Sequence, residues 1–233
     1  MGSIDEALKA FRKGIPVLIY DSSDREDEVD YVIYGGAVDV DVIYEMRTLA
    51  GGLICYAMGR GAVQVLGLRF ASDYLQKVEP LAELVKMPRY GESPAFSVWV
   101  NHVSVATGIR DVDRAITIRE LHIVSKLVYE GSVEKAKQKF YEEFMAPGHV
   151  PILAERSLSV RRGHTELSLA LARLAGVIPS VALVEMLAKG RQLTYEEAMR
   201  VSREYGYPLI RGDDIIRETI RRTGPPQLGD RPS

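Results

Sequence analysis

A mixed α+β fold, with a sheet layered between helices in an α/β/α-type sandwich, is the architecture that the sequence predicts. Short β-branched runs alternate irregularly with amphipathic segments, without the strict strand and helix period of a doubly wound sheet. Hydrophobic residues make up 46% of the 233 residues and charged residues 27%, a balance typical of a globular chain with its own core. Composition does not change abruptly along the chain, so we expect one domain over residues 1–222, followed by a disordered tail at 223–233.

The first part of the chain predicts a helix, three strands and a second helix. Ser3 and Glu6 form a capping box that opens an amphipathic helix, and Gly14 ends it. Apolar and β-branched runs predict the strands, and a helix before the pair Gly51 and Gly52 has a glycine stop. We expect strands at 16–20, 29–34 and 53–58, a helix at 41–50, and loop with short helical pieces in the glycine- and proline-rich stretch 59–95.

The rest of the chain predicts further strands and helices in the same way. A second capping box, Thr117 with Glu120, predicts a helix that starts there and ends before Gly131. A third box pairs Thr194 with Glu197. We expect strands at 96–100, 149–153, 180–185 and 208–210, helices at 133–144, 165–174, 194–205 and 213–222, and a turn at Ala146-Pro147-Gly148.

Charge and cysteine content exclude several classes of function. The 30 Lys and Arg are scattered among 32 acids, which argues against a nucleic-acid partner. Cys55 is the single cysteine, so an intrachain disulfide is impossible and a reducing compartment is expected. The start of the chain lacks a signal-peptide pattern, and no apolar run approaches the roughly 18 residues of a membrane span. We therefore expect a soluble cytoplasmic protein without a membrane partner.

An acidic loop lies between the first two predicted strands. Five acids fill seven positions from Asp24 to Asp30, and Glu26 and Glu28 are among them. Such a density of like charge is unfavourable unless a cation joins it, and Mg²⁺ prefers carboxylate oxygens. A solvated acidic turn is an equally good interpretation of the loop by itself.

The second cluster is Arg161-Arg162-Gly163-His164-Thr165-Glu166, directly before an apolar helix. Free backbone N–H groups at a helix start, a glycine and two guanidinium groups describe an anion site, most naturally for phosphate. An arginine-rich first turn with Thr165 merely capping the helix is the alternative. The chain has neither a P-loop motif nor a G-x-G-x-x-G motif, so a nucleotide enzyme of either type is not expected.

Weaker candidates stand alone in the sequence. His149 starts a strand, where a histidine is more often a hydrogen-bonded structural group than an acid or base. Glu185 ends the apolar strand VALVE and is either a general base or a simple strand-end charge. Thr107 with Gly108 could form a phosphate turn, and Cys55 is expected to be a small buried hydrophobe.

In order and spacing these segments resemble the 3,4-dihydroxy-2-butanone 4-phosphate synthase family, especially its single-domain archaeal form. The resemblance covers nearly the whole chain, from about residue 4 to residue 220. It rests on DREDEVD (24–30), AGGLICYAM (50–58), FSVWVNH (96–102), TGIRDVDRAITI (107–118), APGHV (146–150), RRGHTE (161–166) and VEML (184–187).

The resemblance implies roles for individual residues. It implies that Glu26 and His164 bind magnesium, or manganese, with two ions at the site. The implied catalytic residues are His149 and Glu185, and Glu28 is a further candidate because its carboxylate is available for the proton transfers of the implied reaction. The implied substrate-binding residues are Arg25, Glu26, Asp30, Thr107, Arg161, Arg162, Gly163, His164, Thr165 and Glu185, among which Arg161 and Thr165 hold the phosphate.

The implied reaction converts D-ribulose 5-phosphate to L-3,4-dihydroxybutan-2-one 4-phosphate and formate, in riboflavin biosynthesis. The resemblance also implies a homodimer with sites completed across the interface. Three departures from the family pattern are Val29, Arg110 and Val184. Other hypotheses are a different metal-dependent isomerase or aldolase of sugar phosphates, a nucleotide- or RNA-binding module of related fold, and a catalytically inactive member.

Overall fold

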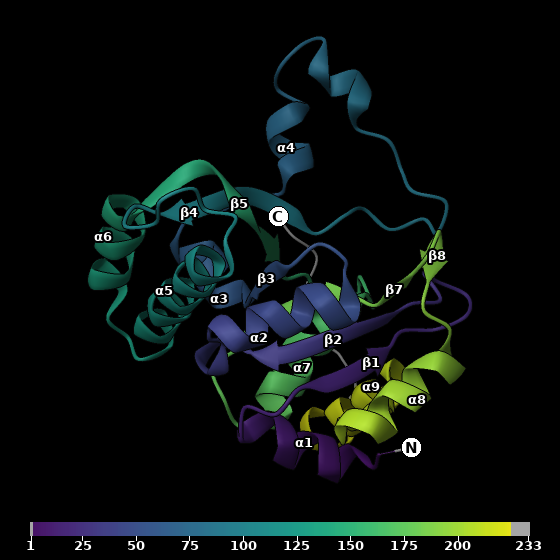
Figure 1. Ribbon diagram of the computed structural model, residues 1–233. Coiled ribbons are helices and arrows are strands. Elements are labelled where there is room, and N and C mark those ends of the chain that lie inside the picture. Colours follow the sequence, from purple (N-terminus) through teal and green to yellow (C-terminus); the bar gives the residue numbers. More distant parts are fainter. Residues whose placement is uncertain (1, 225–233) are drawn as a thin grey trace.

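The computed structural model describes residues 2–224, and a mixed seven-stranded sheet runs through them (Figure 1). Its strands lie in the order β4-β5-β3-β6-β2-β1-β9. Neighbours are antiparallel except for β3 with β5 and β1 with β9. The bounds are β1 Val17–Tyr20, β2 Val29–Tyr34, β3 Cys55–Met58, β4 Phe96–His102, β5 Phe144–Ala154, β6 Ser180–Glu185 and β9 Leu209–Arg211, and β7 Leu187–Ala188 with β8 Arg191–Gln192 forms a separate hairpin.

Helices cover both faces of this sheet. The helices are α1 Ile4–Arg12, α2 Val40–Glu45, α3 Arg60–Val65, α4 Ala71–Leu75, α5 Asp111–Tyr129, α6 Val133–Glu143, α7 His164–Leu174, α8 Tyr195–Tyr205 and α9 Gly212–Thr223. Side chains of β1 alternate between two cores, so that Leu18 belongs to the core that contains residues of α2, α5 and α8, while Ile19 belongs to the core with α1, α7 and α9. The predicted layered α+β sandwich is therefore confirmed.

The capping boxes at both ends of the chain form as predicted. Ser3 accepts a hydrogen bond from the backbone of Glu6 at the start of α1, and Thr194 does the same for Glu197 at α8. The helix predicted at 41–50 is α2 continued by a π-helical turn, Met46–Ala50, and Gly51 ends it in the left-handed conformation with φ of 84°. Strands β2 and β6 have the predicted bounds.

The start of α5 was predicted wrongly. The helix begins at Asp111, so Thr117 lies in its middle and is fully buried. The Thr117 hydroxyl donates to the carbonyl oxygen of Asp113 and accepts a hydrogen bond from the amide of His102. The spacing of Thr117 and Glu120 thus mimics a capping box, although the hydroxyl joins α5 to β4.

The predicted turn at residues 146–148 lies inside β5 and does not precede it. Val100 of β4 pairs with Val150, while its neighbour Asn101 pairs with Met145, so residues 146–149 form a wide bulge. Gly148 lies so close to the backbone of Val100 that a side chain there would collide with it. The bulge leaves His149 exposed at the surface.

The stretch 59–95, predicted as loop with short helices, has that structure, and its part from α4 onward, residues 71–95, projects as an arm. It contains α3, α4 and the 3₁₀ turn η3 (Leu81–Leu84), and Figure 1 shows α4 and the segment after it standing away from the body. The β7–β8 hairpin was not predicted. The tail predicted from residue 223 begins inside α9, and residues 225–233 lie outside the described part.

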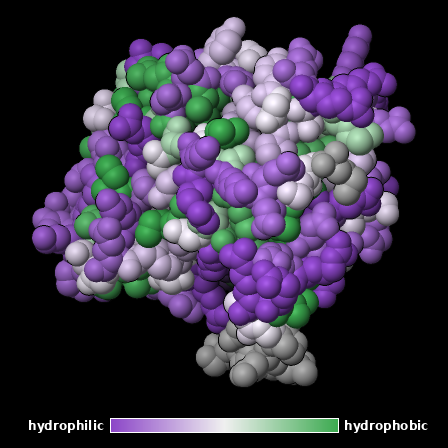
Figure 2. Space-filling view, turned by 90° about the horizontal axis from the view of Figure 1, so that it is seen from below, coloured by the Kyte–Doolittle hydropathy of each residue, from purple (hydrophilic) through white to green (hydrophobic). Residues whose placement is uncertain are grey.

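The surface on the side of α1, α8 and α9 is largely hydrophilic, with hydrophobic residues in separate patches (Figure 2). This is the pattern expected of helices whose apolar stripes face the sheet. Within residues 2–224, none of the helices combines the length and apolar character that crossing a membrane requires.

Candidate active site

A cavity of about 150 Å³ opens where β2, β6 and the start of α7 meet. Seven of the residues singled out in the sequence line it. They come from the acidic loop, from the RRGHTE motif and from the end of β6: Glu26, Glu28, Asp30, Arg161, His164, Thr165 and Glu185. The acidic loop and the RRGHTE motif, 130 and more residues apart, therefore build one site together with the end of β6, and we call this cavity the active-site pocket.

The acidic loop is folded around Asp21 and is not a simple solvated turn. The Asp21 carboxylate accepts hydrogen bonds from the backbone amides of Glu26 at 3.1 Å and Glu28 at 3.0 Å, and from the guanidinium of Arg25 at 3.1 Å. Asp21 itself is buried, with 5% of its surface exposed. These bonds fix the backbone so that Glu26 and Glu28 face the pocket.

His164 is oriented from behind by a backbone carbonyl. Its Nε2 donates to the carbonyl oxygen of Ile19 at 3.1 Å, which leaves Nδ1 facing the pocket. Nδ1 lies 3.6 Å from Glu26 Oε2 and 3.5 Å from Asp30 Oδ1. A hydrogen bond of this kind to the far nitrogen is what usually orients a metal-binding histidine in proteins.

The charges of these groups are strongly coupled. Burial opposes the charged form of His164, but Asp30 and Glu26 outweigh it and raise the pKa of the imidazole to about 9. Burial likewise would raise the pKa of Glu26, yet the hydrogen bond from His164 and the charge of Arg25 lower it to about 2. Burial raises the pKa of Asp30 to about 8, with the charges of Glu185 and Glu26 in the same direction and His164 opposing.

The donor set fits a divalent cation. Asp21, Glu26 and His164 offer ligand atoms within 4.8 Å of one another. Asp30 Oδ1 is buried without a hydrogen-bond partner, an arrangement that is unfavourable unless a ligand completes it. A cation between Glu26 and His164 would take the place of the imidazole proton and satisfy these oxygens.

The RRGHTE motif builds an anion site beside these acids. Glu166 is fully buried and anchors this side, because its Oε2 pairs with Arg161 while Oε1 accepts the amide of Arg156 at 3.0 Å. Burial raises the pKa of Glu166, with Arg161 opposing. Gly163, and not Thr165, is the N-cap residue of α7, so Thr165 lies in the first helical turn with its side chain in the pocket.

Two buried guanidinium nitrogens at this end of the pocket have no hydrogen-bond partner. They are Nη2 of Arg25 and Nε of Arg161. A Cβ on Gly163 would collide with Arg161 and would lie 2.6 Å from Arg25 Nη2, so glycine is needed for both guanidinium groups to converge. Unsatisfied buried donors at a helix start are suited to an oxyanion such as phosphate.

Glu185 is held at the opposite wall by the loop that precedes β3. Its Oε2 accepts the amide of Leu53 at 2.8 Å, and its backbone carbonyl accepts the amide of Gly52 at 3.1 Å. A side chain on Gly52 would collide with the Glu185 carboxylate. Glu185 is therefore a rigidly placed carboxylate that faces Cys55, which is 2% exposed and lines the same pocket.

Two predicted site residues, His149 and Thr107, lie outside the active-site pocket. His149 accepts and donates hydrogen bonds with Asn101, whose Oδ1 receives the His149 amide at 2.8 Å. The Thr107 amide and hydroxyl and the Gly108 amide all donate to the Asp113 carboxylate, which also pairs with Arg110. A Cβ on Gly108 would collide with Asn101, so both residues belong to one surface group.

Arg162 also lies outside the active-site pocket, where it is exposed and lines two neighbouring cavities. Arg25 lines one of these, and its guanidinium reaches Glu26 at 2.7 Å.

Sequence reasoning missed Tyr90, which lines the pocket, and Glu92, whose carboxylate lies 2.8 Å from Arg25 and 3.9 Å from Arg161. Both belong to the stretch without periodicity, where no sequence signal marks them.

Comparison with known proteins places this geometry in a family. The family model described as 3,4-dihydroxy-2-butanone 4-phosphate synthase matches residues 5–218. A protein of that name from Archaeoglobus fulgidus is 45% identical over 91% of this chain and 92% of its own length. One from Methanosarcina acetivorans is 38% identical over 95% of this chain and 93% of its own length. A crystal structure of such a synthase in complex with two magnesium ions has a TM-score of 0.76 and 25% identity, and the match covers 96% of this chain and 99% of that one.

Proposed function

The chain belongs to the 3,4-dihydroxy-2-butanone 4-phosphate synthase family, and we propose that the active-site pocket is where it converts D-ribulose 5-phosphate to L-3,4-dihydroxybutan-2-one 4-phosphate and formate in riboflavin biosynthesis. The observation that carries the proposal is the meeting of a cation site and an anion site in one cavity. A small sugar phosphate needs both, because its phosphate and its ketone lie at opposite ends of a short carbon chain.

The cation end is formed by Glu26 and His164. These two residues would hold magnesium or manganese, whose charge, when bound, polarises the ketone and hydroxyl oxygens of the substrate. Asp30, with a buried oxygen that lacks a hydrogen-bond partner, would contact the sugar hydroxyls. The two-ion complex of the related synthase supports the choice of metal.

The phosphate end is formed by Arg161, Arg25 and the first turn of α7. The unpartnered guanidinium N–H groups would donate to the phosphate oxygens, and the Thr165 hydroxyl and free helix amides would complete the site. Gly163 allows the phosphate to approach the backbone closely.

Carboxylates that are fixed in place at the pocket wall would carry out the proton transfers. Glu185 has one oxygen held by the Leu53 amide, and the other would take up a proton from the substrate carbon or its hydroxyls. Glu28, half-buried in the same wall, would return a proton during loss of water.

His149 and Thr107 would reach the active-site pocket of a second copy of the chain. Both are exposed, and Val103, Ile109 and Met145 near them in sequence are exposed hydrophobic residues, 47%, 53% and 44% accessible. A homodimer with shared sites would cover these residues and bring His149 to a pocket that, within one chain, does not contain it. The single buried Cys55 supports a reducing, cytoplasmic location.

The reaction is tested by incubating the protein with ribulose 5-phosphate and Mg²⁺ and measuring formate. We expect the protein to release formate. EDTA should abolish this release, and the variants Glu26→Gln and His164→Asn should not show it. A folded, metal-loaded protein that consumes the substrate without formate would be an isomerase or aldolase instead.

The shared site is tested by mixing two inactive variants. Glu26→Gln and His149→Ala are unfolded together and refolded, so that half of the dimers contain one copy of each. One site in each mixed dimer is then intact, and about a quarter of the wild-type activity should return if the sites are shared. Failure to recover activity, with the mixed dimer present, would contradict the shared site.

A further inference from the structure

A second cavity lies on the outer side of the RRGHTE motif, between α7, α9 and the loop at 155–162. Its volume is about 380 Å³, which is within the range of pockets that bind small molecules. It shares no lining residue with the active-site pocket. We call it the arginine pocket, and the proposed function leaves it without a role.

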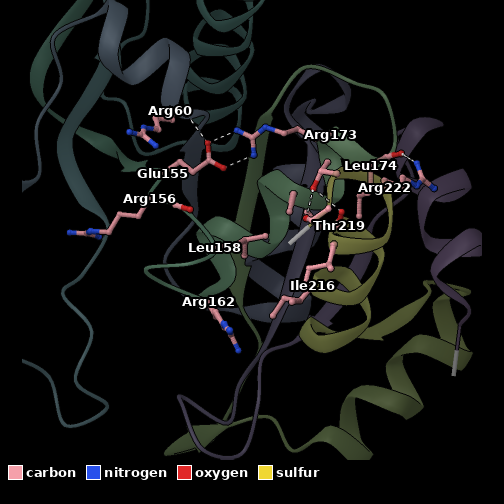
Figure 3. A pocket seen from close by; sticks show the side chains of 15 residues that line it. Arg60, Glu155, Arg156, Leu158, Arg162, Arg173, Leu174, Ile216, Thr219 and Arg222 are labelled. Carbon is pink, nitrogen blue, oxygen red and sulfur yellow. Dashed lines mark hydrogen bonds and ion pairs between the residues drawn. The ribbon is translucent and has the colours of Figure 1, made fainter. Parts of the chain in front are cut away.

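The floor of the arginine pocket is apolar and its walls are cationic. Five arginines line it: Arg60, Arg156, Arg162, Arg173 and Arg222. The floor consists of Leu158, Ala170, Leu174, Ile216 and Ile220. Figure 3 shows Leu158 and Ile216 between Arg162 on one side and the Arg173–Glu155 pair on the other.

Most of these charges are already compensated by the protein. Glu155, the one acid among the described lining residues, forms a bidentate pair with Arg173. Arg222 pairs with Glu218 and donates to the Leu174 carbonyl oxygen. Arg156 donates to the carbonyl oxygens of the arm and stacks on Phe70, with 3.5 Å from its guanidinium carbon to the ring centre.

Arg162 differs from these neighbours. Among the described residues, no acid or acceptor lies within hydrogen-bonding or ion-pairing distance of its guanidinium, although Arg161 next to it pairs with Glu166. Its side chain stands at the edge of the apolar floor, adjoining Leu158 and Ile216 in Figure 3. An uncompensated guanidinium beside an apolar floor suits a ligand that has both an anionic group and an apolar part.

We propose that the arginine pocket binds an amphipathic anion, a small molecule with an apolar body on the Leu158–Ile216 floor and a phosphate, sulfonate or carboxylate group on Arg162. The substrate of the active-site pocket lacks such a body, since a sugar phosphate is polar throughout. The proposal therefore stands apart from the proposed reaction and is tested by binding alone.

The probe is 8-anilinonaphthalene-1-sulfonate, which joins an apolar ring system to one anionic group, and its neutral counterpart is N-phenyl-1-naphthylamine. Fluorescence titration of the full chain should show a site for the sulfonate that saturating ribulose 5-phosphate does not displace. Arg162→Glu should weaken binding of the sulfonate about tenfold or more, Arg162→Lys about twofold, and neither should change binding of the neutral amine. Thr219→Trp, which fills the cavity, should abolish binding of both probes.

Arg200→Glu is the matched control, because Arg200 is exposed on α8 and does not line the arginine pocket. It should leave both affinities unchanged, and circular dichroism should show that every variant is folded. Equal affinity for the two probes, unchanged affinity in Arg162→Glu, or displacement by ribulose 5-phosphate would each overturn the proposal.

Discussion

Asp30 on β2 lies directly opposite Glu185 on β6, as a register pair of adjacent antiparallel strands. Two carboxylates in this relation repel each other unless something cationic lies between or beside them. His164 supplies part of that charge at 3.5 Å from Asp30. The sheet thus holds the acids of the active-site pocket together at a cost that substrate and cation binding would offset.

Glu185→Gln is expected to lower kcat about 10²- to 10⁴-fold, the usual contribution of a general acid or base. The amide oxygen can still accept from Leu53, and removal of one of two opposed charges should leave the melting temperature equal or higher. The kcat is measured from formate release, and the melting temperature from thermal unfolding. Glu204→Gln, on the exposed face of α8, is the control, and an active Glu185→Gln would exclude the proposed role.

Divalent cations should stabilise the wild type through Glu26 and His164. At an Mn²⁺ concentration a hundredfold above its Kd, the free energy of unfolding should rise by about 2.7 kcal/mol, which is visible as a rise in melting temperature. His164→Asn should lose this rise even without substrate. A rise of equal size in the variant would place the cation elsewhere, for instance near the acids on α5 and α6.

Glu92→Gln is expected to lower the KM for ribulose 5-phosphate several-fold, about 2- to 10-fold. The Glu92 carboxylate lies 2.8 Å from Nε of Arg25 and 3.9 Å from Nε of Arg161, so its negative charge would compete there with the substrate phosphate. Steady-state kinetics and competition by inorganic phosphate measure the effect. Glu83→Gln on the same arm is the control, and a higher KM in Glu92→Gln would show that Glu92 positions the arginines instead.

Gly163→Ala is expected to raise KM tenfold or more with a smaller change in kcat. The added methyl group would displace Arg161 and lie 2.6 Å from Arg25 Nη2, so phosphate binding suffers first. Gly61→Ala in α3 is the control, because its Cβ would meet Tyr129 at ordinary contact distances of 3.4 to 3.5 Å. That control should be stabilised by about 0.5–1 kcal/mol. Wild-type kinetics in Gly163→Ala would contradict the close approach.

His122 should make the protein sensitive to acid. Burial lowers the pKa of this histidine from 6.5 to about 4, so its neutral form is favoured in the folded state. The stabilisation that comes from neutral His122 is complete above pH 6.5. It is lost as the pH falls from 6.5 to 4, where the unfolded chain binds a proton that the folded chain does not. Melting temperatures across this range should fall less steeply in His122→Gln than in the wild type or in His149→Gln.

The sequence predicted those elements whose signals are local. Strands β2 and β6 are short runs rich in β-branched residues, and α1 and α8 carry capping boxes whose two partners lie three residues apart. Thr117 shows the limit of such reasoning, because the same spacing served a contact between α5 and β4. The bulge at 146–149 depends on the register with β4, which no local pattern specifies.

Those site residues that belong to recognisable sequence motifs could be predicted from the sequence. Glu26 and His164 follow from two recognisable motifs, although only the fold shows Nδ1 facing the carboxylates. Glu92 and Tyr90 reach the pocket from the arm, and their role depends on tertiary approach alone. Arg162 shares a motif with Arg161 but points to another cavity, because neighbouring residues before a helix face different sides.

Helix α7 carries His164 and Thr165 in its first turn, and ten of its eleven residues are buried between α1, α9 and the sheet. Amide hydrogens in such a helix exchange with solvent only when the whole domain opens. His164 and Thr165 are thus built on a helix that we expect to be among the slowest-exchanging parts of the molecule, and partial unfolding at the periphery would leave these two residues in place. Heat inactivation should accordingly track global unfolding instead of preceding it.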